Sequence, residues 1–69
     1  MNKPTVEQMV HARIKRSDLY KSMIACGRYD NNEVVTRILE MREDVRAGQD
    51  PEEVLYDEGF EPDFVFDLL

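Results

Sequence analysis

The sequence predicts an all-α fold, a small bundle of four or five short helices in a single domain spanning residues 1–69. Two observations indicate this fold. Apolar residues recur every three or four positions through most of the chain, which is the period of a helix face and not of a strand. Residues that favour helix starts precede these stretches and glycines follow them. A chain of this length buries only about 60% of its unfolded surface, so we expect a core of marginal stability.

The first helical stretch begins at a capping box. The Thr5 hydroxyl can accept the Gln8 amide while the Gln8 side chain reaches back to Thr5. Helical spacing then continues toward Cys26, and Gly27 is a natural stop because glycine adopts positive φ without strain. Ser17 can cap a second helix, so this region is either one continuous helix or two short ones with a kink. The apolar stripes of the two halves are Val6, Met9, Val10 and Ile14, then Leu19, Tyr20, Met23 and Ile24.

The second helix is predicted over residues 31–47. Asp30 is a candidate cap with Glu33 three residues on, and Gly48 ends the helix. Arg46 lies near the C-terminal end, where a positive charge interacts favourably with the helix dipole. The face predicted to be apolar comprises Val34, Val35, Ile38, Leu39, Met41 and Val45.

Two further helices are predicted in the last third of the chain. Asp50 caps the first of them, Pro51 occupies its first position, and Glu53 completes a second capping box. Gly59 ends this helix after about two turns. Pro62 opens the last helix, which is predicted to continue to the end of the chain.

The C-terminal pair of helices has packing residues spaced for a tight turn between them. These residues are Val54, Gly59, Phe60, Val65 and Leu68. In these positions residues 50–69 resemble a bacterial helix-turn-helix motif. Leu55 stands where the motif usually has a small alanine, and Glu58 stands where it has an apolar residue before the glycine. The resemblance implies that the two helices pack at a steep angle.

The same resemblance implies that the second helix of the pair reads bases in the major groove of DNA. The outward positions of this helix are Glu61, Asp63, Phe66 and Asp67. From Gln49 onward there are eight acidic residues and no Lys or Arg, so nothing in this segment neutralises phosphate. We therefore expect the geometry of the motif without duplex DNA binding.

Charge is divided unevenly along the chain. Met1–Arg28 carries six Lys or Arg and two acids, a net charge of +4, whereas Tyr29–Leu69 carries three Arg and thirteen acids, a net charge of −10. Two explanations are open. Either the basic first part covers some of the acidic remainder within the molecule, or the acidic part presents a face to a basic protein.

Few residues are suited to catalysis or to metal binding. His11 and Cys26 are the single residues of their types, and the ligand sets of structural zinc sites are missing. We expect no enzyme activity, no cofactor, no metal and no small-molecule substrate. Cys26 cannot form an internal disulfide, which fits a reducing compartment, and is predicted to be a small buried hydrophobe. Without an apolar run long enough for a membrane span or a signal peptide, we expect a cytoplasmic protein that contacts no membrane.

Aromatic and acidic residues are concentrated near the C-terminus, where four of the six aromatic residues fall between Tyr56 and Phe66. An apolar patch rimmed by acids is a surface on which proteins dock. The residues predicted to contact a partner are Glu61, Asp63, Phe66, Asp67 and Leu69. The leading hypothesis is a small acidic regulator or inhibitor that docks its acidic and aromatic C-terminal half on a basic protein surface. Small phage inhibitors often act in this way, so a viral origin is one hypothesis.

Two alternatives to this function stay open. In the first, a helix-turn-helix-like regulator places its basic N-terminal helix on DNA and uses its acidic half to form a homodimer. In the second, the protein is a structural subunit of a larger assembly, and its exposed apolar surface is an obligate interface.

Overall fold

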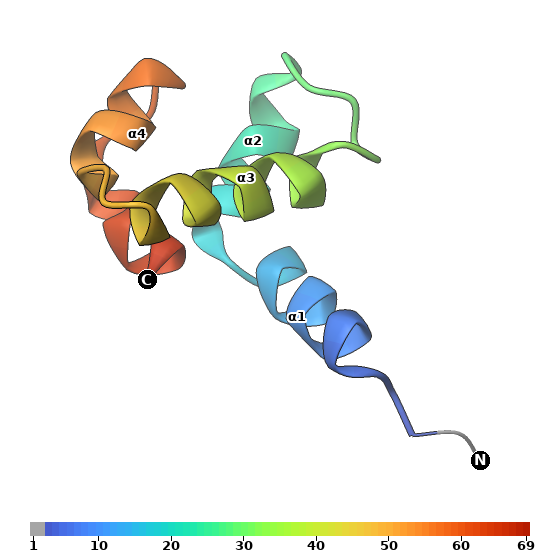
Figure 1. Cartoon of the computed structure of the whole chain (residues 1–69). Helices are drawn as coiled ribbons and strands as arrows, with labels where there is room; N and C mark the ends of the chain where they lie inside the picture. Colours follow the sequence, from blue (N-terminus) through green and yellow to red (C-terminus); the bar gives the residue numbers. More distant parts are fainter. Residues whose placement is uncertain (1–2) are drawn as a thin grey trace.

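The five secondary-structure elements in the described part of the chain are all helical. The computed structural model describes residues 3–69, which contain no strand and confirm the all-α prediction. The elements, in chain order in Figure 1, are α1 (Val6–Lys15), α2 (Asp18–Cys26), α3 (Val34–Arg46), α4 (Pro51–Asp57) and the 3-10 helix η1 (Pro62–Leu68).

Every element contributes side chains to one core. The buried apolar residues are Ile14, Leu19, Met23, Val34, Val35, Ile38, Met41, Val54, Leu55 and Leu68. Helix α1 packs only its C-terminal half on this core, against α2 and α3, and its N-terminal half projects away from the other helices (Figure 1). The Cα radius of gyration is therefore 12.4 Å, above the value of about 11 Å that is expected for a compact chain of this length.

The first helical stretch is two helices and not one. Ser17 caps α2, because its Oγ accepts the Tyr20 amide at 3.2 Å and donates to the Ile14 carbonyl at 2.6 Å. The predicted capping box of α1 is confirmed, with the Gln8 amide 3.1 Å from the Thr5 hydroxyl and the Thr5 amide 2.9 Å from the Gln8 side-chain oxygen. The break at Ser17 lets α1 leave the core at its own angle.

Helix α3 begins three residues later than predicted. The Asp30 carboxylate accepts the Asn32 amide at 2.9 Å, two residues on, and so closes a local turn instead of capping a helix. Residues 31–33 form a turn, and the N-cap residue Glu33 makes no side-chain cap bond. The expected start at residue 31 is therefore wrong. At the other end α3 stops at Arg46, one residue before the predicted end.

Helix α4 has the predicted start and stop, with one difference. The Asp50 carboxylate accepts the Glu52 amide at 2.9 Å, so the capping box expected with Glu53 is wrong. At the C-terminal end Gly59 has φ of 83° and its amide donates to the Tyr56 carbonyl at 2.9 Å, while the amide of the next residue donates to the Leu55 carbonyl at 2.9 Å. This pair of bonds is the Schellman arrangement, which satisfies the last carbonyls of the helix.

The last helix is a 3-10 helix, which sorts its side chains into rows of every third residue. One row faces outward and contains Asp63, Phe66 and Leu69, all exposed. The next row contains Val65 and the buried Leu68. The C-terminal pair thus has the order helix, turn, helix, but its second member is not the α-helix that reads DNA in the motif that residues 50–69 resemble.

Candidate partner-binding surfaces

The residues predicted to contact a partner lie along η1 but do not form one surface. Glu61 and Asp63 are exposed, and so are Phe66 at 81% and Leu69 at 73%. Glu61 lines a groove with Tyr56, Gly59, Phe60 and Pro62. The other groove along η1 contains Phe66, Asp67 and Leu69. The predicted contact residues therefore lie in two different environments on the protein surface.

The first environment is acidic and is centred on Tyr56, which is 73% exposed. Val54 and Leu55 point into the core, so the residues that follow them on α4 point outward. Tyr56 stands three and four positions after Glu53 and Glu52 and shares their side of the helix. The acidic surface comprises Glu52, Glu53, Tyr56, Asp57, Glu61 and Asp63, which are all exposed.

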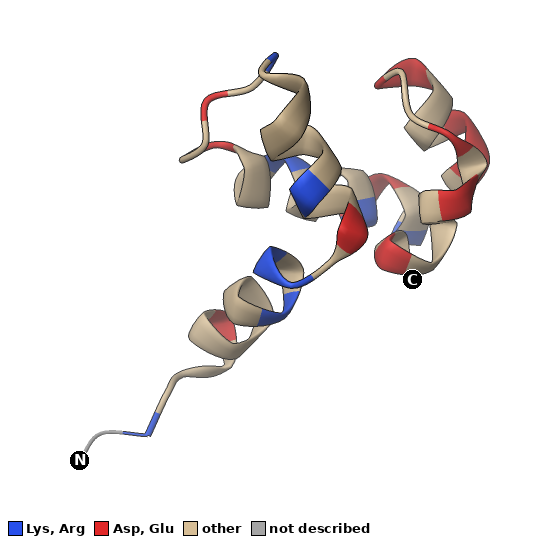
Figure 2. Ribbon diagram, turned by 180° about the vertical axis from the view of Figure 1, so that it is seen from behind, with Lys and Arg blue, Asp and Glu red and all other residues tan. Residues whose placement is uncertain are grey.

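The acids of this surface take part in no ion pair within residues 3–69. The pairs that do form join His11 to Glu7, Arg37 to Glu40 and Glu58, and Arg46 to Glu43. None of these pairs joins a basic residue of the first half to an acid of the second half. In the ribbon of Figure 2 the α4–η1 part of the chain is coloured for acids and carries no basic residue, whereas basic residues lie on α1, α2 and α3. The uneven charge is thus separated in space and is not neutralised internally by ion pairs.

The second environment, the groove that contains Phe66, is basic. Phe66, Asp67 and Leu69 share their groove with Ser17 and with three arginines, Arg13, Arg16 and Arg42. The predicted apolar patch rimmed by acids is therefore wrong at Phe66, whose groove contains three arginines and one acid, Asp67. The arginines are far from η1 in sequence, and only the packing of α1 and α3 beside η1 brings them there. Sequence patterns within η1 carried no signal for this arrangement.

Asp67 differs from the other predicted contact residues because its polar groups have partners within the chain. Its Oδ2 accepts the Leu19 amide at 3.0 Å, and its carbonyl accepts Arg42 Nε at 3.1 Å. The carboxylate therefore acts as a second cap for α2, beside Ser17. The hydrogen bond from the Leu19 amide to Asp67 thus holds η1 against α2.

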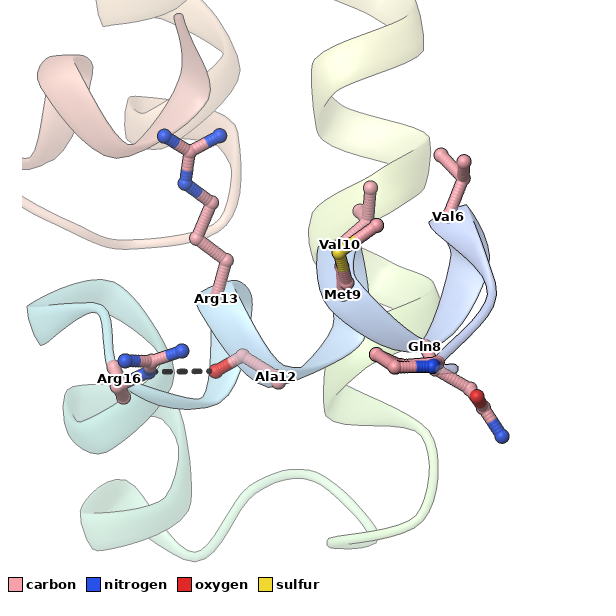
Figure 3. A pocket seen from close by; sticks show the side chains of 8 residues that line it. Val6, Gln8, Met9, Val10, Ala12, Arg13 and Arg16 are labelled. Carbon is pink, nitrogen blue, oxygen red and sulfur yellow. Dashed lines mark hydrogen bonds between the residues drawn. The ribbon is translucent and has the colours of Figure 1, made fainter. Parts of the chain in front are cut away.

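The projecting part of α1 carries a further groove, which is lined by Pro4, Val6, Gln8, Met9, Val10, Ala12, Arg13 and Arg16. Figure 3 shows Val6, Val10 and Arg13 on the same side of the helix. Val6 is 73% exposed and Met9 is 51% exposed. The expected core stripe of this helix is thus wrong in its first turn, because only Ile14 is fully buried.

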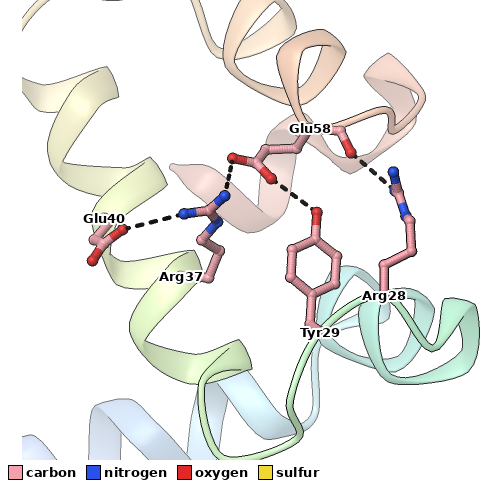
Figure 4. A network of polar contacts seen from close by, with 5 residues as sticks. All are labelled: Arg28, Tyr29, Arg37, Glu40 and Glu58. Atoms are coloured by element: carbon pink, nitrogen blue, oxygen red, sulfur yellow. Dashed lines mark hydrogen bonds and ion pairs between the residues drawn. The ribbon is translucent and has the colours of Figure 1, made fainter.

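Glu58, the residue that departs from the helix-turn-helix pattern, is held by three side chains (Figure 4). Its carboxylate accepts the Tyr29 hydroxyl at 2.8 Å and lies 3.3 Å from Arg37. Its carbonyl accepts Arg28 Nη2 at 3.0 Å. Burial, followed by the hydrogen bond to Glu58, raises the pKa of Tyr29. Glu58 is therefore an internal link from α4 both to the loop that precedes α3 and to α3 itself, and it is not part of the acidic surface.

Cys26 is exposed, so the expectation that it is a buried hydrophobe is wrong. It is the last residue of α2, where its Sγ donates to the Met23 carbonyl at 3.1 Å. A hydrogen bond from the Arg28 backbone lowers the pKa of the Cys26 thiol. Within residues 3–69 no group of three or more His, Cys, Asp or Glu side chains is placed to hold a metal ion. No helix in the described part of the chain has both the length and the apolar composition to cross a membrane.

No protein-family model matches the chain, and comparison with curated proteins and with solved structures finds no significant match. The basis for a function is therefore the geometry of the chain's own surfaces.

Proposed function

We propose that the protein is a small acidic binding module that regulates or inhibits a partner by docking its C-terminal half on a basic protein surface. The observation that carries this proposal is the acidic surface around Tyr56. Its acids have no ion-pair partners within residues 3–69, and the exposed aromatic ring lies among them. An unpaired acidic field around an exposed aromatic side chain matches the polar rim and the anchor of protein interfaces.

The two kinds of residue have different effects on binding. Exposed acids steer a basic partner toward the surface and therefore act mainly on the association rate and its salt dependence. An aromatic side chain that loses its water at the interface acts mainly on the dissociation rate. Tyr56 is the anchor of the acidic surface, whereas Phe66 and Leu69 lie in the groove with Arg13, Arg16 and Arg42.

Site-specific photocrosslinking tests the proposal in cells of the source organism. A photoreactive phenylalanine analogue replaces Tyr56 in one variant and the exposed Ala25 on α2 in the control. We expect position 56 alone to capture a protein with a basic surface. Adding Asp57→Lys and Glu61→Lys should abolish that crosslink, because the reversed charges repel a basic partner. These two exposed acids form no ion pair within residues 3–69, so the fold should be retained. Capture of the same proteins from both positions, or no effect of the charge reversal, contradicts the proposal.

Binding kinetics with the captured protein then separate the two roles. Asp63→Lys is expected to slow association at low salt. Tyr56→Ala is expected to speed dissociation. A stoichiometric complex that survives high salt and does not exchange favours the structural-subunit alternative instead.

One observation favours the DNA-associated regulator as a second candidate. Arg13, Arg16 and Arg42 meet in one groove, and the acids of α4 lie away from them (Figure 2). Arginines in such a groove can contact phosphate groups of a nucleic acid. A gel shift at low salt with wild type and with Arg13→Glu/Arg16→Glu tests this candidate. Binding that the reversal abolishes supports it, and equal binding or no binding contradicts it.

A further inference from the structure

We infer that the acidic surface of one copy docks on the projecting α1 helix of a second copy, so that the protein associates head to tail. This inference rests on the proposed function, because it uses the same acidic surface and names its basic partner as this chain itself. The receiving face, here called the basic-apolar surface, comprises Val6, Met9, Arg13, Arg16, Phe66 and Leu69.

The basic-apolar surface is continuous because two residues join its grooves. Arg13 and Arg16 line both the groove along α1 and the groove beside η1. Four of the five exposed large apolar side chains of the described residues lie on this surface, and the fifth is Tyr56. Arginine and apolar side chains that alternate on an exposed face match the composition of interface centres.

The charges of this surface indicate what can cover it. No acid lines the groove along α1, because the acid of this helix, Glu7, lies 4.0 Å from His11 on another side. Two copies of α1 packed face to face would therefore offer Arg13 and Arg16 no opposite charge. An acidic face with an apolar centre suits this groove better.

The acidic surface of the same chain has that composition. Glu52, Glu53, Asp57 and Glu61 surround Tyr56, whose ring can enter the groove beside Met9. Within one molecule the Tyr56 ring does not reach the groove along α1, because α1 projects away from the other helices and α4 lies across the molecule from it in Figure 1. Pairing between copies removes this obstacle. A contact between two different surfaces is heterologous, so it leads to a ring or to an open chain of copies.

Sedimentation velocity on the purified protein tests the inference. Wild type is expected to exceed the monomer mass and to grow with concentration at about 0.1 M salt, and to return toward the monomer at about 1 M, where the Debye length falls from about 10 Å to about 3 Å. Arg13→Glu/Arg16→Glu lacks the basic-apolar surface and should be monomeric. Asp57→Lys/Glu61→Lys lacks the acidic surface and should also be monomeric.

Mixing the two charge-reversed variants gives the most specific outcome. Each variant keeps the surface that the other has lost, so an equimolar mixture should associate although each variant alone is monomeric. Lys15→Glu and Asp44→Lys are the controls, because these exposed residues lie outside both surfaces and each reversal changes the net charge in the same direction as one of the double variants. Both controls should associate as wild type does.

Several results overturn the inference. The inference is wrong if wild type stays monomeric at every concentration at low salt. It is also wrong if the mixture of the two variants stays monomeric. If Asp57→Lys/Glu61→Lys still associates while Arg13→Glu/Arg16→Glu does not, α1 pairs with itself. Circular dichroism checks that each variant is folded, and Arg13→Gln/Arg16→Gln replaces the Glu pair if that variant is not.

The outcome also separates this inference from the proposed function. Suppose that wild type is monomeric and that its crosslink from position 56 is lost on charge reversal. The acidic surface is then a binding site for a different basic protein, and the inference of self-association fails alone. If position 56 captures only a second copy of this chain, and wild type associates head to tail, the acidic surface serves self-association alone.

Discussion

The carboxylate of Asp67 accepts a hydrogen bond from the Leu19 amide at 3.0 Å, across 48 positions of sequence. It therefore satisfies one of the free amides at the start of α2, and Ser17 satisfies another. Asp67, which the sequence predicts to contact a partner, thus joins η1 to α2. The capping bond has a consequence for stability that can be measured.

Asp67→Ala is expected to lower the free energy of unfolding by about 1 kcal/mol, the usual effect of losing a helix cap. Asp67→Asn keeps an acceptor oxygen and should lose less. Asp63→Ala is the matched control on the same helix, because its side chain is exposed, and it should stay within about 0.5 kcal/mol of wild type. Urea denaturation measures all three. Equal effects at the two positions contradict the capping role.

Gly59→Val is expected to destabilise the fold strongly. Gly59 has φ of 83°, and a Cβ atom added there lies 3.3 Å from the Arg28 guanidinium. A side chain in this left-handed region costs about 1–2 kcal/mol, and a β-branched one costs more. Gly27→Ala is the control for backbone strain alone, because φ there is 72° and no atom lies within 4 Å. An unchanged thermal midpoint for Gly59→Val contradicts the assignment of this turn.

Tyr29 should make stability depend on pH in the alkaline range. Burial and the hydrogen bond to Glu58 raise the pKa of Tyr29 above its ordinary value of 10.0. The folded chain therefore holds this proton more tightly than the unfolded chain. The resulting stability is fully present below pH 10.0 and is lost as pH rises through the folded pKa.

Tyr29→Phe isolates this effect from the other groups that titrate at high pH. At neutral pH the substitution should cost about 1 kcal/mol, because the hydrogen bond to the Glu58 carboxylate is lost. The difference between wild type and Tyr29→Phe should shrink as pH rises above 10.0. Thermal melts over this range give the difference at each pH, and a constant difference contradicts the predicted linkage.

Wild type is not expected to bind duplex DNA appreciably at physiological salt. The net charge is −6, and the eight acids after Gln49 have no Lys or Arg among them to neutralise phosphate. A gel shift with random and specific duplexes at about 0.15 M salt measures this. Sub-micromolar, sequence-specific binding under these conditions would restore the DNA-associated alternative.

The sequence alone determined the helical fold and most of the helix ends. The Thr5 capping box, the Ser17 cap and the stop at Gly59 are local hydrogen bonds and backbone preferences, which neighbouring residues decide. The start of α3 was not predictable in the same way, because an Asp side chain can either cap a helix or close a turn. At Asp30 the turn is formed.

Only the tertiary structure decided how surface residues are grouped. Phe66 stands among acids in the sequence but beside Arg13, Arg16 and Arg42 in space, because α1 and α3 pack against η1. Tyr56 could have been placed outward from helical spacing, whereas Asp67 could not have been assigned to the α2 cap. Contacts between distant segments depend on the angles at which helices cross and leave the core, and local periodicity carries no information about those angles.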